Sequence, residues 1–150
     1  MQDLTRRRLE ADTFLEFARL ANLEHQRLQS LFSAVDLTEV TPQQSRVLMV
    51  LFQAREPMTA RQLSIEMGCS EVTMSRFIKA LVRGDWVDRE PDPNDGRAFR
   101  LSPTDKARNA LPRFIRVSNQ LLDRIFNGFS GEEVQHLAES MQRIRRNLAD

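Results

Sequence analysis

Residues 59–101 read TARQLSIEMGCSEVTMSRFIKALVRGDWVDREPDPNDGRAFRL, and this stretch decides the fold. TARQLSIEMG and EVTMSRFIKALVRG have the pattern of two short helices, separated by the two-residue turn Cys69-Ser70. The sequence that follows places two extended runs around a turn rich in Pro, Asn, Asp and Gly. A helix-turn-helix with a β-wing is a geometry that puts its second helix in a DNA groove. The stretch therefore predicts duplex DNA as a partner.

Composition limits the other classes of function. The chain has 150 residues and 41% hydrophobic residues, which fits one globular domain. It has no apolar run long enough to span a membrane, and MQDLTRRRLEAD lacks the apolar segment of a secretory signal. A single cysteine, Cys69, excludes an internal disulfide and fits a reducing cytoplasm. We interpret it as a small residue buried in the turn and not as a redox-sensing thiol. We find no catalytic signature, phosphate loop or zinc-like spacing, so we expect no enzyme activity, no cofactor and no metal site.

Net charge does not decide between the remaining classes. The whole chain is at +1, and residues 59–101 carry seven Lys and Arg against seven Asp and Glu. DNA affinity depends on cations placed against phosphates and not on total charge. The positions of the cations must therefore carry the argument.

The flanking sequence predicts further helices. Thr41 to Gln44, Thr59 to Gln62 and Ser130 to Glu133 fit the capping box, and Ser102-Pro103-Thr104-Asp105 is a weaker version of it. We expect helices over about 5–34, from Thr41 toward Pro57, over 103–127 and after Ser130. The fold class is mainly α with a small β-wing: a winged helix-turn-helix core plus N- and C-terminal dimerisation helices.

The terminal helices carry apolar stripes. The last helix has a heptad seam formed by Val134, Leu137, Met141, Ile144 and Leu148. The stripes either pack within the same chain or form a homodimer interface, and we favour the homodimer. We expect a single domain over 1–150, in which 41–101 is the DNA-binding lobe and 1–36 and 103–150 are dimerisation helices.

The second helix of the motif has two distinct faces. Successive residues turn by about 100°, which places Met74, Phe77, Ile78 and Leu81 together as a core stripe. The opposite face carries a basic row with small residues at its N-terminal end: Val72, Ser75, Arg76, Lys79 and Arg83, with Thr73 and Ala80 at the flank. Cations reach phosphates or guanine edges, while Val72 suits a thymine methyl group. The alternative is an ordinary solvated face.

The wing adds a second candidate contact. Arg97 directly follows the Asp92–Gly96 turn, where it is placed to enter a narrow minor groove. We expect Asp95 to brace the Arg97 guanidinium, although the two side chains alternatively form only an exposed ion pair. Arg89 and Arg100 are weaker candidates for phosphate contacts.

At this point the sequence resembles the MarR family of bacterial transcription regulators. The resemblance rests on TPQQSRVLMVL, VTMSRFIKALVRGDWVDRE, the wing pattern Asp92-x-x-Asp95-x-Arg97, and LSPTDKARNAL, and it covers nearly the whole chain. It implies a homodimeric repressor of palindromic operators, released by a small anionic or phenolic effector. It also implies that DNA is contacted at Ser70, Thr73, Ser75, Arg76 and Arg97, with Asp95 steadying the wing arginine.

Two positions depart from the family pattern. Asp85 and Asp105 stand where the family usually has glycine. Gly84 comes one residue earlier, which allows the helix end to shift, and aspartate is among the few residues that tolerate a left-handed conformation at 85. Asp105 is expected to serve the helix cap after Ser102. By resemblance, an effector pocket lies between the winged lobe and the dimer helices, with candidate anion partners at Arg19, His25, Arg46 and Arg113.

The sequence thus predicts a DNA-binding regulator whose candidate residues are Ser70, Val72, Thr73, Ser75, Arg76, Lys79, Arg83, Arg89, Asp95 and Arg97. Two alternatives stay open. One is a winged-helix adaptor that binds protein and not DNA. The other is a DNA binder with little sequence preference.

Overall fold

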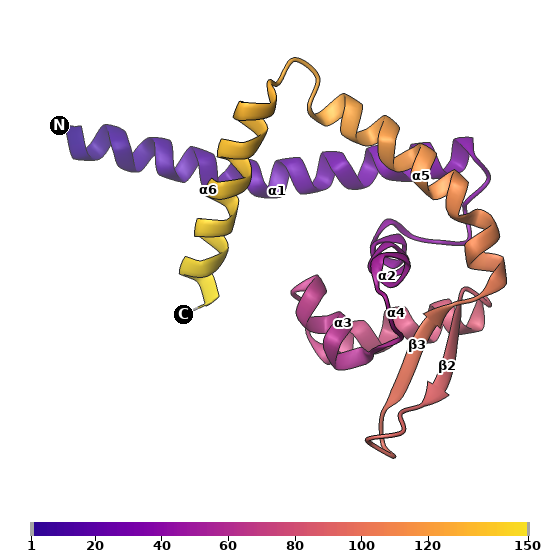
Figure 1. The fold of residues 1–150 in the computed structure, drawn as a ribbon. Coiled ribbons are helices and arrows are strands. Elements are labelled where there is room, and N and C mark those ends of the chain that lie inside the picture. The colour runs from indigo at the N-terminus through magenta and orange to yellow at the C-terminus, as the bar shows by residue number, and fades with distance from the viewer. Residues whose placement is uncertain (1, 150) are drawn as a thin grey trace. The chain divides into compact units, whose positions relative to one another are not determined.

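The computed structural model describes residues 2–149 and is mainly helical (Figure 1). Its elements, in chain order, are α1 (Gln2–Ala34), α2 (Pro42–Gln53), β1 (Met58–Thr59), α3 (Ala60–Met67), α4 (Glu71–Arg83), β2 (Val87–Pro91), β3 (Phe99–Pro103), α5 (Asp105–Ile125) and α6 (Gly131–Ala149). The chain divides into two compact units, one up to Val117 and one from Ser118 onward. The predicted fold class is confirmed. Within the described residues, no helix is long and apolar enough to cross a membrane.

Local sequence signals fix most helix starts. Thr41 and Thr59 each form the predicted capping box, in which the threonine hydroxyl accepts from the backbone three residues on and a glutamine side chain accepts in return. Ser130 accepts from the Glu133 backbone N–H at 3.1 Å, and the Glu133 carboxylate accepts from the Ser130 N–H at 2.7 Å. The predicted starts of α2, α3 and α6 are therefore confirmed.

The start of α5 differs from the prediction. Pro103 is the last residue of β3 and is not the first helical residue. The cap is Thr104, whose hydroxyl accepts from the Ala107 N–H at 3.1 Å, so neither Ser102 nor Asp105 has the capping role that we expected. The reason is that β3 pairs with β2 as far as Pro103, opposite Val87, and the chain turns helical only after that pairing ends.

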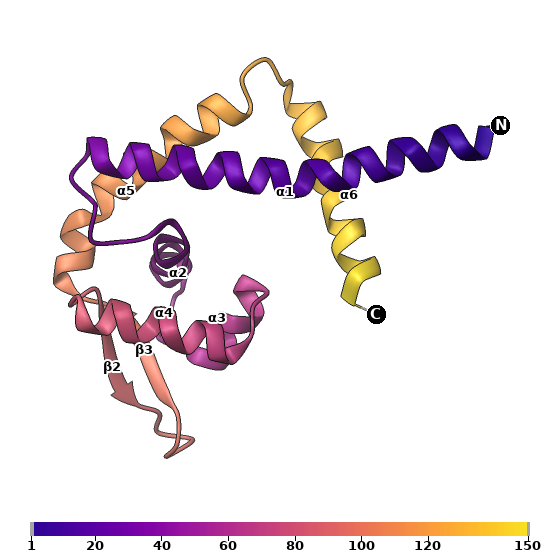
Figure 2. The same ribbon diagram turned by 180° about the vertical axis from the view of Figure 1, so that it is seen from behind.

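The sheet contains one strand more than the sequence predicts. Its order is β1-β3-β2, and both pairings are antiparallel. β1 is only two residues long, with Met58 opposite Leu101 and Thr59 opposite Arg100. β2 and β3 run side by side and project as the wing hairpin, which both views show beyond α4 (Figure 2). β1 thus attaches the wing to the start of the helix-turn-helix.

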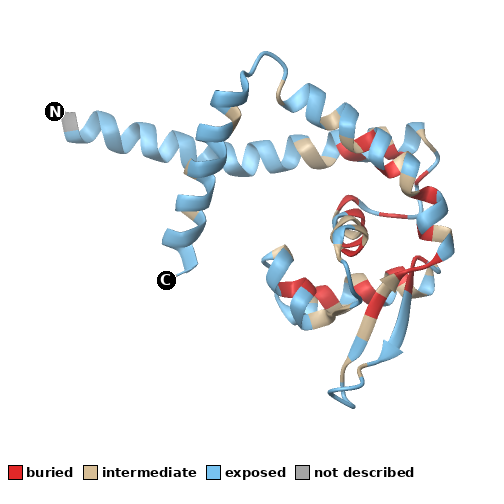
Figure 3. Ribbon diagram, in the orientation of Figure 1, coloured by how far each residue is buried: buried red, intermediate tan, exposed pale blue. Residues whose placement is uncertain are grey.

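The core of the first unit lies where α2, α3, α4, β3 and the start of α5 meet (Figure 3). Met74, Ile78 and Leu81 of α4 are buried there, as predicted, and Phe77 is half-buried. Phe114 of α5 packs edge-on against Phe32 of α1 and against Trp86, with ring centroids 5.8 and 5.9 Å apart. The core therefore fixes which side of α4 faces outward.

Candidate nucleic-acid interface

The outer face of α4 carries the predicted basic row. Arg76, Lys79 and Arg83 are exposed, and within residues 2–149 none of them forms an ion pair with an acidic side chain. Val72 is 67% exposed although it is apolar, and Ser75 is half-buried beside it. Val72 places an apolar side chain of the size that suits a thymine methyl group beside this basic row. These five residues lie together on one face, as the helical spacing predicts.

The N-terminal end of α4 is organised by Ser70 and Thr73. The Ser70 hydroxyl accepts from the Thr73 backbone N–H at 3.1 Å, which caps the helix. The same hydroxyl donates to Thr73 Oγ1 at 3.0 Å. Because the Ser70 proton is used in this way, the Thr73 hydroxyl keeps its own proton available for an outside acceptor. Ser70 thus supports the helix and orients Thr73.

The wing tip is shaped by two aspartates that bind the backbone. Asp92 Oδ1 accepts from the Asn94 N–H at 2.9 Å, and Asp95 Oδ1 accepts from the Arg97 N–H at 3.0 Å. Both contacts are turns of the kind that aspartate favours. Asp95 therefore holds the main chain at Arg97, and the expected brace to the Arg97 guanidinium is not formed. The Arg97 side chain is exposed, at the tip of the hairpin.

The remaining wing arginines are held in different ways. Arg89 lies over the exposed ring of Phe99, with its guanidinium carbon 4.3 Å from the ring centroid. Arg100 forms an ion pair with Asp92, at 3.5 Å between Nε and Oδ1. Arg100 is thus engaged within the hairpin. Arg89 and Arg97 are therefore better placed than Arg100 to contact DNA.

Sequence reasoning missed some residues of this region. Phe99 supports Arg89 from the neighbouring strand, and only the register of β2 and β3 reveals that contact. Ile65 of α3 is 71% exposed, a second uncovered apolar side chain in the helix-turn-helix. In the sequence, the feature that indicated the exposure of Ile65 was its position on the outward side of a short helix.

Three of the four candidate effector residues have polar partners within the chain. Arg19 pairs with Glu16 and Arg46 with Glu24, each at 2.5 Å. Arg113 donates to the backbone carbonyls of Val35 and Asp36 at 3.3 and 3.2 Å. These three cations already have partners in the chain. His25 is half-buried.

Comparison with known proteins agrees with this geometry. Residues 40–99 match the model of the MarR family. The chain is 26% identical over 141 residues to the HTH-type transcriptional repressor IacR of Pseudomonas putida, which covers 94% of this chain and 82% of IacR. It is also 26% identical over 76 residues to the HTH-type transcriptional regulator YybA of Bacillus subtilis (strain 168), where the match spans only about half of either chain (51%).

Solved structures share the fold. The structure of reduced AbfR bound to DNA superimposes with a TM-score of 0.80 at 19% identity, over 97% of both chains. A MarR transcriptional regulator from Methanosarcina mazei Go1 gives a TM-score of 0.77 at 18% identity, over 91% of this chain and 96% of that one. The family model covers the helix-turn-helix and most of the wing, and these folds extend the likeness over nearly all of the chain. Residues 40–99 of this protein thus match the MarR family of transcriptional regulators by sequence, and nearly the whole chain shares its fold with solved MarR-family structures.

Proposed function

We propose that this regulator binds a pseudo-palindromic DNA operator as a homodimer and acts as a repressor. The observation that carries the proposal is the outer face of α4, where Arg76, Lys79 and Arg83 are exposed without ion-pair partners among the described residues. A helix whose other face is locked in the core can enter a major groove without losing its packing. The IacR relative is itself named a repressor, which supports repression and not activation of transcription.

Each candidate residue has a proposed role. Arg76 reads a base edge, and Lys79 and Arg83 neutralise phosphates. Thr73 donates its free hydroxyl proton, and Val72 packs against a thymine methyl group. Arg97 enters the minor groove from a wing tip held by Asp95, and Arg89 contacts a phosphate from its seat on Phe99.

Exposed apolar side chains on two helices support the homodimer. In α1 they include Leu9, Phe14, Phe17, Leu20 and Leu23, and in α6 Leu137, Met141 and Leu148. α6 has no buried residue. Apolar surface of this extent marks an interface, and a two-fold symmetric reader matches two half-sites in successive major grooves. We propose that both helices pack against a second copy of the chain.

Alanine variants test the operator reading. We expect Arg76→Ala to weaken operator binding by about 1–3 kcal/mol if Arg76 reads a base, with relaxed specificity at that base. We expect Arg97→Ala to weaken binding most at A·T-rich flanks, where the narrow minor groove concentrates negative potential. Neither change should alter dimerisation. Fluorescence anisotropy with labelled duplexes measures the binding, and sedimentation measures the dimer.

The control is Arg108→Ala, which removes an exposed arginine from α5 with the same loss of charge. The operator reading is wrong if all three variants bind as the unaltered protein does. Equal losses in all three would instead indicate a binder that responds to total charge with little sequence preference. A protein that dimerises but binds no duplex would support the adaptor alternative.

We extend the proposal to release of the operator by a small anionic or phenolic effector. It rests on the family resemblance, and Arg19, Arg46 and Arg113 already have partners within the chain. An effector must displace those partners or bind elsewhere. A panel of such compounds should raise the melting temperature and lower operator affinity. If no compound changes either quantity, this part of the proposal fails.

A further inference from the structure

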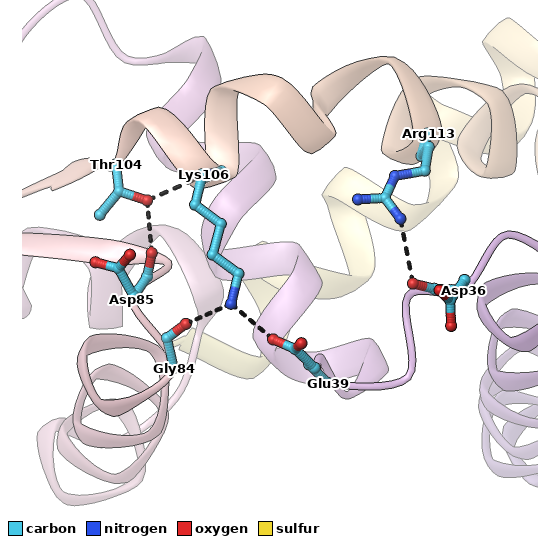
Figure 4. A network of polar contacts seen from close by, with 8 residues as sticks. Asp36, Glu39, Gly84, Asp85, Thr104, Lys106 and Arg113 are labelled. Carbon is cyan, nitrogen blue, oxygen red and sulfur yellow. Dashed lines mark hydrogen bonds and ion pairs between the residues drawn. The ribbon is translucent and has the colours of Figure 1, made fainter.

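A cluster of polar contacts holds the C-terminal end of α4, far along the helix from Ser70 and Arg76. Its centre is Lys106, at the start of α5 (Figure 4). The Lys106 ammonium donates to Glu39 Oε2 at 2.7 Å and to the Gly84 carbonyl at 2.8 Å. It also lies 4.6 Å from the ring centroid of Trp86. One cation therefore joins α5, the α1–α2 loop and the end of α4.

The contact with Gly84 is electrostatically favourable. Gly84 is the C-cap of α4, and the last carbonyls of a helix have no partner within the helix. They form the negative end of the helix dipole, which a lysine side chain stabilises. Lys106 supplies this cation from another element, so the contact fixes the helix end in space as well as capping it.

Thr104 adds two hydrogen bonds to the same segment. Its hydroxyl donates to the Asp85 carbonyl at 2.7 Å, and its backbone N–H donates to the Trp86 carbonyl at 3.2 Å. The backbone carbonyls of residues 84, 85 and 86 thus each accept a hydrogen bond. The donors are Lys106, near the start of α5, and Thr104, which caps it.

Arg113 makes a parallel contact on the same face of α5. It lies seven residues, or about two turns, after Lys106, and it donates to the Val35 and Asp36 carbonyls just beyond α1. α5 therefore carries two cations in line, and each holds the C-terminal end of a different helix. Glu39 lies between those ends in sequence and pairs with Lys106.

The orientation of α4 affects DNA binding because a small tilt of a helix displaces its far end by several ångströms. α4 has 13 residues and is roughly 20 Å long at 1.5 Å per residue. A tilt of about 10° about its C-terminal end moves the N-terminal end by roughly 3 Å over that length. Hydrogen bonds to base edges tolerate much smaller errors, on the order of 0.5 Å. The contacts at the C-terminal end therefore act together with the buried Met74, Ile78 and Leu81 to set where Thr73 and Arg76 lie.

We propose that Lys106 is a positioning residue for DNA recognition: it touches no DNA, and it fixes the recognition helix α4 through Gly84, Glu39 and Trp86. This inference rests on the proposed function, because it needs α4 to enter the major groove. It assigns to α5 the role of setting the angle at which α4 is presented.

The test compares Lys106→Met with Lys106→Arg, Glu39→Gln and the control Arg108→Met. Lys106→Met keeps most of the side-chain length and removes the charge, while Arg108→Met removes the same charge from an exposed position on α5. We expect Lys106→Met to weaken operator binding about 3- to 10-fold, in line with the strength of a cation at a helix end. We expect Lys106→Arg to restore most of it, Glu39→Gln to give a smaller loss, and Arg108→Met to have little effect.

Two further readouts separate positioning from other roles. A residue that contacts a phosphate lowers the slope of log affinity against log salt by about one when it is removed. We expect the slope to be unchanged in Lys106→Met. Trp86 is the only tryptophan of the chain, so its fluorescence should change in Lys106→Met and stay constant in Arg108→Met.

Several results would overturn the inference. One is unchanged operator affinity in both Lys106→Met and Glu39→Gln, and another is a salt slope that falls by about one in Lys106→Met. If Lys106→Met fails to fold, Glu39→Gln decides alone, because Glu39 is exposed and its substitution leaves the Gly84 contact in place. Failure of the unaltered protein to bind DNA is a different outcome, since it refutes the proposed function itself.

Discussion

At the scale of single residues, two neighbouring positions end α4 in different ways. Asp85 adopts a left-handed conformation, with φ 61°, which aspartate is among the few residues to tolerate. Its N–H donates to the Val82 carbonyl at 3.1 Å and the Trp86 N–H to the Leu81 carbonyl at 2.8 Å, which is the Schellman arrangement of a helix end. The backbone at position 84 has φ −82°, which any residue can adopt. Glycine is required there because a side chain would collide with the Trp86 ring.

Gly84→Ala should therefore destabilise the fold. A Cβ at this position would lie 2.8 Å from Trp86 Cδ1, and the Trp86 ring is only 3% exposed and cannot swing away. Overpacking of this kind costs about 1–3 kcal/mol. Gly96→Ala is the matched control, because nothing lies within 4 Å of its added Cβ. Chemical denaturation of both variants measures the difference, and equal stability of the two would contradict the account.

Residue identities allowed much of the candidate interface to be anticipated. The helical period alone separated the buried Met74 and Ile78 from the exposed Arg76 and Lys79. The role of Asp95 was wrong in detail, because an aspartate two residues before an arginine can bind either its backbone or its side chain. The sequence does not distinguish these two contacts.

At the scale of elements, the link between β3 and α5 was the part that the sequence misplaced. Ser102 and Thr104 are both good caps, and Pro103 suits either a strand end or a first helical turn. The choice is made by tertiary pairing of β3 with β2, which local sequence does not contain. β1 was missed for the same reason, since a two-residue strand exists only through its partner β3.

Thr104 joins elements that meet only in the folded chain, and Thr104→Ala tests that junction. The substitution removes both the cap of α5 and the hydrogen bond to the Asp85 carbonyl. We expect a loss of about 1–3 kcal/mol, the sum of a cap and a further hydrogen bond. Ser130→Ala removes only the cap of α6 and should cost about 1 kcal/mol. Thermal unfolding of the two variants compares them, and a smaller loss in Thr104→Ala would speak against the junction.

At the scale of the whole molecule, the exposed stripe of α1 is the feature that a single chain leaves unexplained. Phe14 is 69% exposed and Leu20 is 58% exposed. The hydrophobic spacing of the helix was visible in the sequence. The sequence did not reveal which surface covers this stripe, because the sequence of one chain does not specify its partner.

Phe14→Glu should convert the proposed homodimer to monomers. A buried, unpaired carboxylate is strongly unfavourable, so the substitution acts only if Phe14 is covered by the second copy. We expect sedimentation to show a monomer whose circular dichroism is unchanged and whose operator affinity is greatly reduced. Gln26→Glu, at an exposed polar position of the same helix, is the control and should stay dimeric. Persistence of the dimer in Phe14→Glu would remove α1 from the interface.

The central claim is that this protein, whose residues 40–99 match the MarR family model, reads DNA sequence through α4 and the wing. The most direct test is a titration of the purified protein against duplex DNA from its own promoter region and against a scrambled duplex of equal length, at two salt concentrations. The account predicts saturable binding of two chains per site, with a preference for the promoter of about 10³-fold or more. Equal, salt-labile binding to both duplexes, or binding to neither, would contradict it.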